Sequence, residues 1–178
     1  MKKTSENKNS KKAEKPLVGI LMGSDSDWPK IRAAADALTE FGVSYEVHVM
    51  SAHRTPALVE DFVKNADARG IKVILAAAGG AAHLAGVVAS HTVLPVIGIP
   101  VATDFCGGLD SLLSMVQMPG DIPVATVAVG GGGPRNAGIL AAEIIALGDK
   151  NLREKLLAFR KKLVEKIVEK DKALQEKL

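Results

Sequence analysis

Two short polar runs, each lying between an apolar stretch and a helical stretch, carry most of the reactive side chains of this sequence. The first is GSDSD at residues 23–27, and the second is SAHRT at residues 51–55. The guanidinium of an arginine can bind two phosphate oxygens at once, and imidazole suits proton transfer because its ordinary pKa is about 6.5. The glycine permits a tight turn and the serines add hydroxyl donors. The two runs therefore favour a site that binds a phosphorylated ligand and moves a proton.

Each run also has a purely structural interpretation. Asp27 is suited to cap the helix that follows it, and residues 51–55 could be a surface turn before a helix that begins at Pro56. The run at 23–27 matches neither the Walker loop nor the GxGxxG pattern. A site is favoured because both runs fall at the same edge of the predicted sheet.

Five apolar stretches of strand length alternate with helical stretches, which predicts right-handed crossovers and a parallel sheet covered on both faces. The predicted strands are residues 17–22, 44–50, 71–77, 95–101 and 122–129, and the predicted helices are residues 28–41, 55–69, 81–91, 109–118 and 134–147. We predict a flavodoxin-like three-layer α/β/α sandwich with a five-stranded parallel sheet and a long C-terminal helix. The sequence alone leaves the strand order open, but in this fold ligands bind where the order reverses.

The chain divides into three predicted parts. Residues 1–15 contain six lysines and two glutamates and are expected to be a disordered basic tail. Residues 16–148 are expected to form the α/β catalytic domain. In residues 149–178, an apolar stripe is expected to dock a helix on its own domain or on a neighbouring subunit. The stripe consists of Leu152, Leu156, Phe159, Leu163 and Ile167.

Composition excludes several classes of protein. The net charge is +3 for the whole chain but +4 for residues 1–15, so the remainder carries −1, which argues against a nucleic-acid partner. Aromatic residues make up only 3%, too few for base stacking. No apolar run reaches the ~18 residues that a membrane span needs. A single cysteine excludes an intramolecular disulfide, and we expect a cytoplasmic protein.

Other candidate residues are weaker. His83 is expected in the first turn of the helix that follows Gly79 and Gly80 and could reach the same cleft, whereas His48 and His91 are expected to be structural or exposed. The histidines lack metal-ligand spacing, so no metal is expected. Cys106 is interpreted as a small residue at the cleft rim. The four glycines at 130–133 could cradle a phosphate, but a flexible crossover is favoured because no Lys or Ser follows as in a P-loop.

Six runs of the sequence together resemble the N5-carboxyaminoimidazole ribonucleotide mutase family, the catalytic component of phosphoribosylaminoimidazole carboxylation in purine biosynthesis. They are LMGSDSDW, SAHRTP, AGGAAHL, GGLDSLLSMVQMP, IPVATVAVG and NAGILAA, in order over about residues 17–170. The combination of SAHRTP with AGGAAHL is the most specific part of the resemblance.

The resemblance implies a homo-octamer with active sites where subunits meet, and an isomerisation that needs no metal or organic cofactor. In this isomerisation, a carboxylate moves from the exocyclic nitrogen to ring carbon C4, which gives 4-carboxy-5-aminoimidazole ribonucleotide. His53 would be the proton shuttle. Arg54, Ser24 and Ser26 would hold the phosphate, and Asp27 the sugar hydroxyls. The full set of substrate-binding residues that it implies is Ser24, Ser26, Asp27, Ser51, Arg54, Ala78, Gly79, Gly80, His83 and Leu84.

Three other interpretations remain. A carboxylase of the same fold takes free CO2 and aminoimidazole ribonucleotide, but that branch of the family tends to carry Lys in place of Arg54 and to lack AGGAAHL. A non-catalytic nucleotide or flavin carrier is disfavoured because Trp28 and Tyr45 are the only Trp and Tyr. A scaffold that assembles through the C-terminal helix would make His53 dispensable.

Overall fold

The computed structural model describes residues 15–178, so the predicted disordered tail lies outside the described residues except for Lys15. Five parallel strands form one sheet in the order β2-β1-β3-β4-β5. The strands are β1 (Val18–Met22), β2 (Tyr45–Val49), β3 (Val73–Ala78), β4 (Val96–Pro100) and β5 (Ala125–Thr126). This order is that of a flavodoxin-like fold and confirms the predicted fold class.

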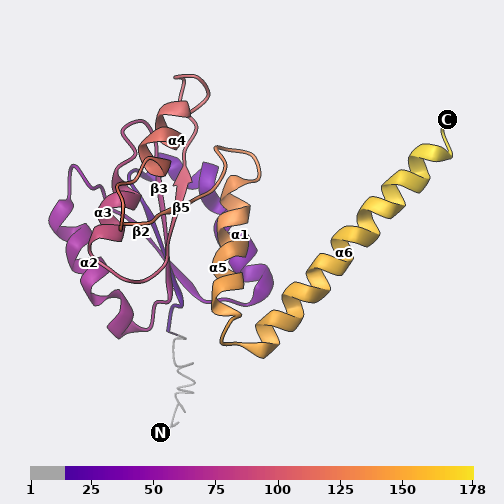
Figure 1. The fold of residues 1–178 in the computed structure, drawn as a ribbon, viewed down its shortest axis with the longest axis horizontal. Helices are drawn as coiled ribbons and strands as arrows, with labels where there is room; N and C mark the ends of the chain where they lie inside the picture. Colours follow the sequence, from indigo (N-terminus) through magenta and orange to yellow (C-terminus); the bar gives the residue numbers. More distant parts are fainter. Residues whose placement is uncertain (1–14) are drawn as a thin grey trace, which may run out of the picture.

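Helices cover both faces of the sheet, as Figure 1 shows. The helices are the short 3-10 helix η1 (Asp25–Asp27), α1 (Trp28–Phe41), α2 (Pro56–Arg69), α3 (Leu84–Ser90), α4 (Leu109–Val116), α5 (Gly133–Ile145) and α6 (Lys150–Gln175). The apolar residues of α1 and α5 pack on one face, and those of α2 and α3, with Met115 of α4, pack on the other. The three predicted layers are therefore present.

The close contact between α1 and α5 requires small residues. A Cβ added to Gly138 would lie 2.4 Å from the carbonyl oxygen of Ala34 and 3.0 Å from the Cβ of Ala37. The two helix backbones can approach this closely only because glycine and alanine face each other. Small residues at this contact thus fix the position of α1, whose first turn borders the polar run at residues 23–27.

The structure corrects the predicted strand at residues 122–129, because β5 comprises only Ala125 and Thr126. This segment is the edge of the sheet and pairs only with β4. Pro123 has no backbone N–H to donate, and most side chains of residues 121–130 remain partly or fully exposed. An apolar composition alone did not distinguish this edge segment from a full strand.

The structure also corrects the predicted side-chain cap of α1 and the predicted start of the helix after β3. Asp27 precedes α1, but its side chain makes no capping hydrogen bond, and it is Ser24 that caps η1 by accepting from the N–H of Ser26. The helix after β3 begins only at Leu84, so His83 lies immediately before it and not within its first turn. The N–H groups of Ala82 and His83 donate to the carbonyls of Gly80 and Ala81, each at 2.8 Å. These bonds reach only two residues back, so they form tight turns and not a helix.

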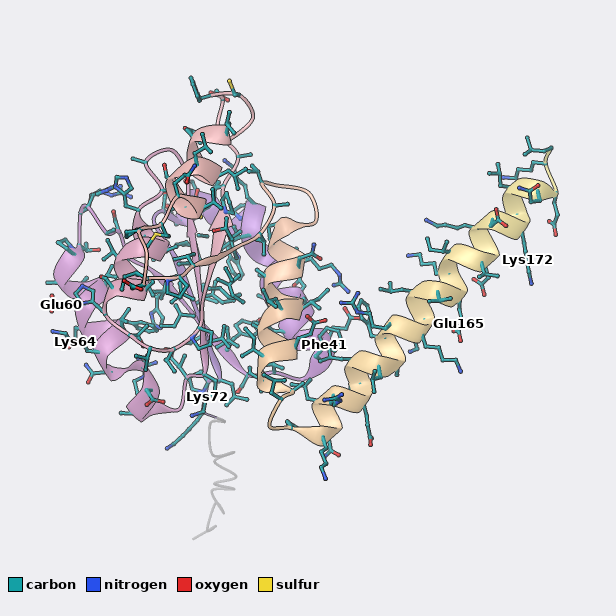
Figure 2. All side chains as sticks on the ribbon, in the orientation of Figure 1. Phe41, Glu60, Lys64, Lys72, Glu165 and Lys172 are labelled. Carbon is teal, nitrogen blue, oxygen red and sulfur yellow. The ribbon has the colours of Figure 1, made fainter. Side chains whose placement is uncertain are left out.

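Only the beginning of α6 docks on the domain. Leu152 and Leu156 are buried, and the ring of Phe159 packs edge-on against Phe41 with 5.3 Å between centroids. Beyond this point the helix projects away from the sheet domain, and Figure 2 shows Glu165 and Lys172 on the projecting part. Ile167 of the predicted stripe is 63% exposed. Within one chain, therefore, the first part of the stripe packs on the sheet domain, and the part around Leu163 and Ile167 does not.

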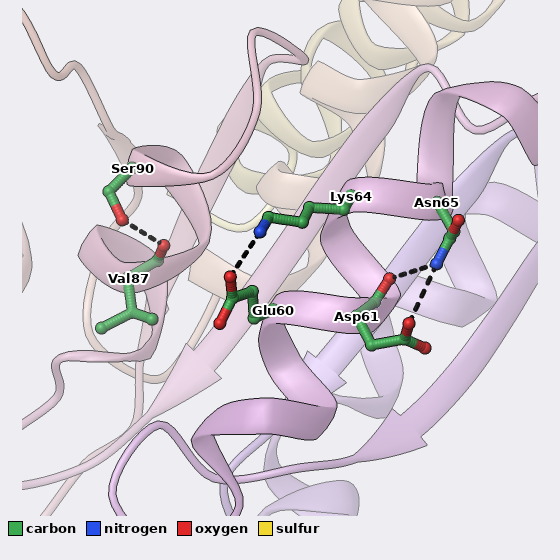
Figure 3. Close-up of polar contacts among 6 residues, drawn as sticks. All are labelled: Glu60, Asp61, Lys64, Asn65, Val87 and Ser90. Atoms are coloured by element: carbon green, nitrogen blue, oxygen red, sulfur yellow. Dashed lines mark hydrogen bonds and ion pairs between the residues drawn. The ribbon is translucent and has the colours of Figure 1, made fainter.

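The outer surfaces of α2 and α3 carry polar contacts between residues close in sequence (Figure 3). Lys64 donates to Glu60 at 2.5 Å and thereby lowers the pKa of that carboxyl, and the Asn65 amide donates to the Asp61 carbonyl at 2.8 Å. Exposed pairs one helical turn apart contribute little to stability. Within residues 15–178, no helix is both long enough and apolar enough to cross a membrane.

Candidate active site

The strand order reverses between β1 and β3, and a cavity of about 370 Å³ opens at the carboxyl ends of these strands. Three loops build it: residues 23–27 after β1, residues 51–55 after β2, and residues 79–83 after β3. Its lining residues are Gly23, Ser24, Asp27, Ser51, Ala52, His53, Arg54, Ala78, Gly79, Ala81, His83 and Leu84. Both polar runs identified in the sequence thus meet in one cavity of the size expected for a small ligand.

The loop after β1 is held by its own side chains. The hydroxyl oxygens of Ser24 and Ser26 lie 2.8 Å apart, and the N–H of Ser26 donates to Asp25 at 3.0 Å. Partial burial raises the pKa of Asp27, against the opposing effects of the nearby Lys30 and Arg54 side chains. Burial makes the ionised form of this carboxyl group less favourable. Carboxyl groups with such a shifted pKa in a cavity are typical of binding sites.

The loop after β2 is likewise held by its own residues. The hydroxyl oxygen of Ser51 accepts from the N–H groups of His53 at 3.3 Å and Arg54 at 3.2 Å. The Thr55 hydroxyl accepts from the Ser51 N–H at 2.8 Å and donates to the Ser51 carbonyl at 3.1 Å. These bonds fix the backbone from which the imidazole and the guanidinium project, and they leave the Ser51 hydroxyl hydrogen free to be donated.

Two imidazole rings that line the cavity meet edge-on. Nε2 of His53 lies 2.8 Å from Nδ1 of His83, with the ring planes 83° apart. One of these nitrogens must donate and the other accept, so the pair holds one hydrogen between two rings. Such an arrangement can deliver a proton to a ligand atom and take one back.

Arg54 spans the gap between the first two loops. Its Nη2 donates to the Gly23 carbonyl at 2.5 Å, which places the guanidinium beside Asp27 and the serines. The side chain is exposed, so its remaining N–H groups can bind a ligand from the solvent side. This position suits a planar cation that holds a phosphate group.

Most of the predicted site residues lie together, and two do not line the cavity. Ser26 points its hydroxyl at Ser24, and Gly80 is half-buried behind the wall that Gly79 and Ala81 form. The predicted set of substrate-binding residues omits three lining residues, Gly23, Ala52 and Ala81, although the first two lie within the polar runs and Ala81 follows Gly80. Their contribution comes from backbone position, which residue type alone does not reveal.

Several weaker candidates lie elsewhere. Cys106 is exposed and does not line the cavity, and neither do His48 and His91. The glycine run at 130–133 is likewise absent from the lining. A Cβ on Gly133 would lie 1.9 Å from the carbonyl oxygen of Ala128, so the start of α5 requires glycine for steric reasons. No three His, Cys, Asp or Glu side chains of the described part of the chain form a group that could hold a metal ion.

Taken together, the fold and the cavity define a flavodoxin-like α/β protein with a ligand site at the carboxyl edge of its parallel sheet. Comparison with known proteins agrees. Residues 17–166 match the family model described as AIR carboxylase. The N5-carboxyaminoimidazole ribonucleotide mutase of Pyrococcus horikoshii is 54% identical over 167 residues, which cover 94% of this chain and 93% of that protein.

Further relatives give the same result. The N5-carboxyaminoimidazole ribonucleotide mutase of Mycobacterium leprae is 56% identical over 160 residues, covering 90% of this chain and 92% of that protein. The crystal structure of Treponema denticola PurE matches with a TM-score of 0.81 and 34% identity, covering 89% of this chain and 98% of that chain. This chain belongs to the AIR carboxylase family.

Proposed function

We propose that this protein is an N5-carboxyaminoimidazole ribonucleotide mutase of purine biosynthesis. The observation that carries the proposal is the pair of imidazoles, 2.8 Å apart, in a cavity that also contains Arg54 and the Asp27 carboxyl group. The high identity to proteins of that name supports the same reaction.

The proposed reaction needs one group that both gives and takes a proton. His53 donates a proton to the carbamate nitrogen of the substrate. The bond between that nitrogen and the carboxyl group then breaks, which releases CO2 and produces an electron-rich aminoimidazole. C4 then attacks the CO2, and His53 takes the proton from C4. His53 gives one proton and takes back one proton, so the reaction balances without an outside acid or a cofactor. His83 holds the ring of His53 in place and shares its hydrogen.

The substrate is held, in this proposal, by the loops after β1 and β2. Arg54 binds the ribose phosphate with the hydroxyls of Ser24, Ser26 and Ser51, and Asp27 accepts hydrogen bonds from the sugar hydroxyls. Its raised pKa fits this role, since the sugar hydroxyls supply the hydrogen bonds that a partly buried carboxylate lacks.

The wall of the cavity is small and apolar where the carboxyl group would migrate. Ala78, Gly79, Gly80 and Leu84 form or support this part of the site. A narrow apolar wall keeps water away from released CO2 and leaves it little room to escape.

We further propose that residues 16–148 form the catalytic unit and that residues 149–178 serve assembly into a homo-octamer. In a single chain His53 and His83 are exposed, so a neighbouring subunit is required to close the cavity over CO2. The exposed apolar residues of α6 supply a surface for such contacts, among them Val164 and Ile167. We also propose a cytoplasmic enzyme, in keeping with a ribonucleotide substrate of purine synthesis, with no nucleic acid or membrane as partner.

The test is a pair of rate assays with the purified full chain. The proposal predicts that N5-carboxyaminoimidazole ribonucleotide is converted to 4-carboxy-5-aminoimidazole ribonucleotide without added bicarbonate or ATP. Turnover only with aminoimidazole ribonucleotide plus CO2 would identify a carboxylase instead and refute the proposal. Copurification of a yellow cofactor without turnover would indicate a flavin carrier.

A further inference from the structure

The loop after β3 is held by two serines of α4, which lies above it (Figure 1). The hydroxyl of Ser111 accepts from the N–H of Gly80 at 2.9 Å and donates to the carbonyl of Val101 at 2.7 Å. The one hydroxyl hydrogen of Ser114 is shared between the carbonyls of Asp110 at 2.7 Å and Gly80 at 3.2 Å. Both backbone groups of Gly80 are therefore bound by side chains from another element.

Ser111 is unusual in its burial. It is 0% exposed and is the only polar side chain classed with the core among residues 15–178. A buried hydroxyl is costly unless it is hydrogen-bonded, and here it both accepts and donates. Alanine has a higher helix propensity and no polar atom to bury, so a serine at this position points to a requirement for its hydrogen bonds.

The end of α4 that carries Ser111 is itself fixed to the loop after β4. The carboxylate of Asp110 accepts from the Thr103 hydroxyl at 2.7 Å and from the Ser111 N–H at 2.8 Å. The hydrogen bond from Thr103 lowers the pKa of Asp110, so this carboxylate stays ionised at neutral pH. Ser111 thus projects toward Gly80 from a backbone that has little freedom to shift.

The connection from Gly80 to the paired imidazoles is short. The carbonyl of Gly80 accepts from the N–H of Ala82 at 2.8 Å, and Ala82 is fully buried. His83 is the next residue, and its Nδ1 faces Nε2 of His53. A displacement at Gly80 therefore moves the ring of His83 with it.

We propose that Ser111 is a positioning residue that sets the location of His83 opposite His53. The proposal deepens the proposed function and rests on it. Ser111 does not line the cavity and touches no substrate; it acts through Gly80 on the loop that carries His83.

The first arm of the test is kinetic. Ser111→Ala is expected to lower kcat about 10- to 100-fold, because a misplaced catalytic group costs rate, while KM changes less than about threefold. In a His83→Ala background the same substitution is expected to lower kcat less than about threefold, because the imidazole that Ser111 positions is then absent. Ser90→Ala is the matched control, because Ser90 donates only to Val87 within α3 at 2.7 Å (Figure 3) and should leave kcat unchanged.

The second arm needs no substrate. Ring-nitrogen NMR of the free, full-length protein is expected to show shifted His53 and His83 signals in Ser111→Ala, with His48 and His91 unchanged. Ser114→Ala removes the longer contact to the Gly80 carbonyl together with the hydrogen bond to the Asp110 carbonyl within α4, and it leaves the Ser111 contacts in place. It should shift the same two signals by less and provides the readout if Ser111→Ala fails to fold.

Two results would overturn the proposal: an equal effect of Ser111→Ala with and without His83, or unchanged His53 and His83 signals in a folded variant. A wild-type protein that does not convert the carbamate substrate would refute the proposed function. The NMR result would still decide whether Ser111 positions His83, so the two failures can be told apart.

Discussion

The loops around the cavity are built in two different ways. The loops at 23–27 and 51–55 are held by hydrogen bonds among their own residues, such as the one from Ser26 to Asp25 at 3.0 Å and that from Ser51 to Thr55 at 2.8 Å. The loop at 79–83 has short backbone hydrogen bonds of its own, but the hydroxyl groups that hold it come from outside, from Ser111 and Ser114 of α4. The self-held loops carry the charged and hydroxyl groups proposed to bind substrate, whereas the externally held loop shapes the wall and aims His83.

The largest expected effect concerns the imidazole of the loop at 51–55. His53→Asn should lower turnover by about 10² to 10⁴, the range that a proton-transferring group contributes, while ligand binding persists. Steady-state kinetics together with a titration of the nucleotide product measure both quantities. His91→Asn, at a histidine outside the cavity, is the control. Retained turnover in His53→Asn would remove this residue from the mechanism.

The next effect concerns the cation of the same loop. Arg54→Ala should weaken binding by about 2–5 kcal/mol, because a charged pair with the phosphate is lost, and should change kcat less. Isothermal titration with ribose 5-phosphate or the nucleotide product checks this. Arg32→Ala, on the exposed face of α1, provides the comparison. An affinity that does not change would argue against a phosphate contact at Arg54.

The self-held loops were the easier part to predict from sequence. Their residue types and their spacing after β1 and β2 pointed to the site, because parallel strands bring successive loops to one edge. The pairing of His53 with His83 and the support from Ser111 depend on contacts across 30 and 31 residues of sequence, which periodicity does not encode. The edge strand β5 was overestimated for a related reason, since pairing on one side only is a property of the assembled sheet.

The difference in construction also predicts a difference in stability. Ser111→Ala leaves the Gly80 N–H and the Val101 carbonyl without their partner in a buried place, which should cost about 1–3 kcal/mol of unfolding free energy. Thr55→Ala breaks bonds in a partly exposed loop where water can replace them, and about 1 kcal/mol is expected. Urea denaturation at one protein concentration measures both. A larger loss in Thr55→Ala would contradict the distinction between the two kinds of loop.

The smallest effect follows from the raised pKa of Asp27, which burial causes. A carboxyl group whose pKa is raised in the folded state stabilises the fold most below its ordinary value of 3.8, and this contribution is lost as pH rises through the folded value. Asp27→Asn should therefore raise the melting temperature slightly at pH 7, and the gain should shrink as pH falls toward 4. The exposed Asp36→Asn on α1 is the control. A lower melting temperature for Asp27→Asn at pH 7 would contradict this assignment.

The central claim is that CO2 released at His53 stays in the cavity until C4 captures it. Incubating the enzyme with N5-carboxyaminoimidazole ribonucleotide carrying a ¹³C carboxylate, in unlabelled bicarbonate, tests this directly by mass spectrometry of the product. Transfer within a closed site predicts that the C4 carboxylate keeps the label. A product whose label has equilibrated with the unlabelled pool would show that CO2 leaves the site and would contradict the account.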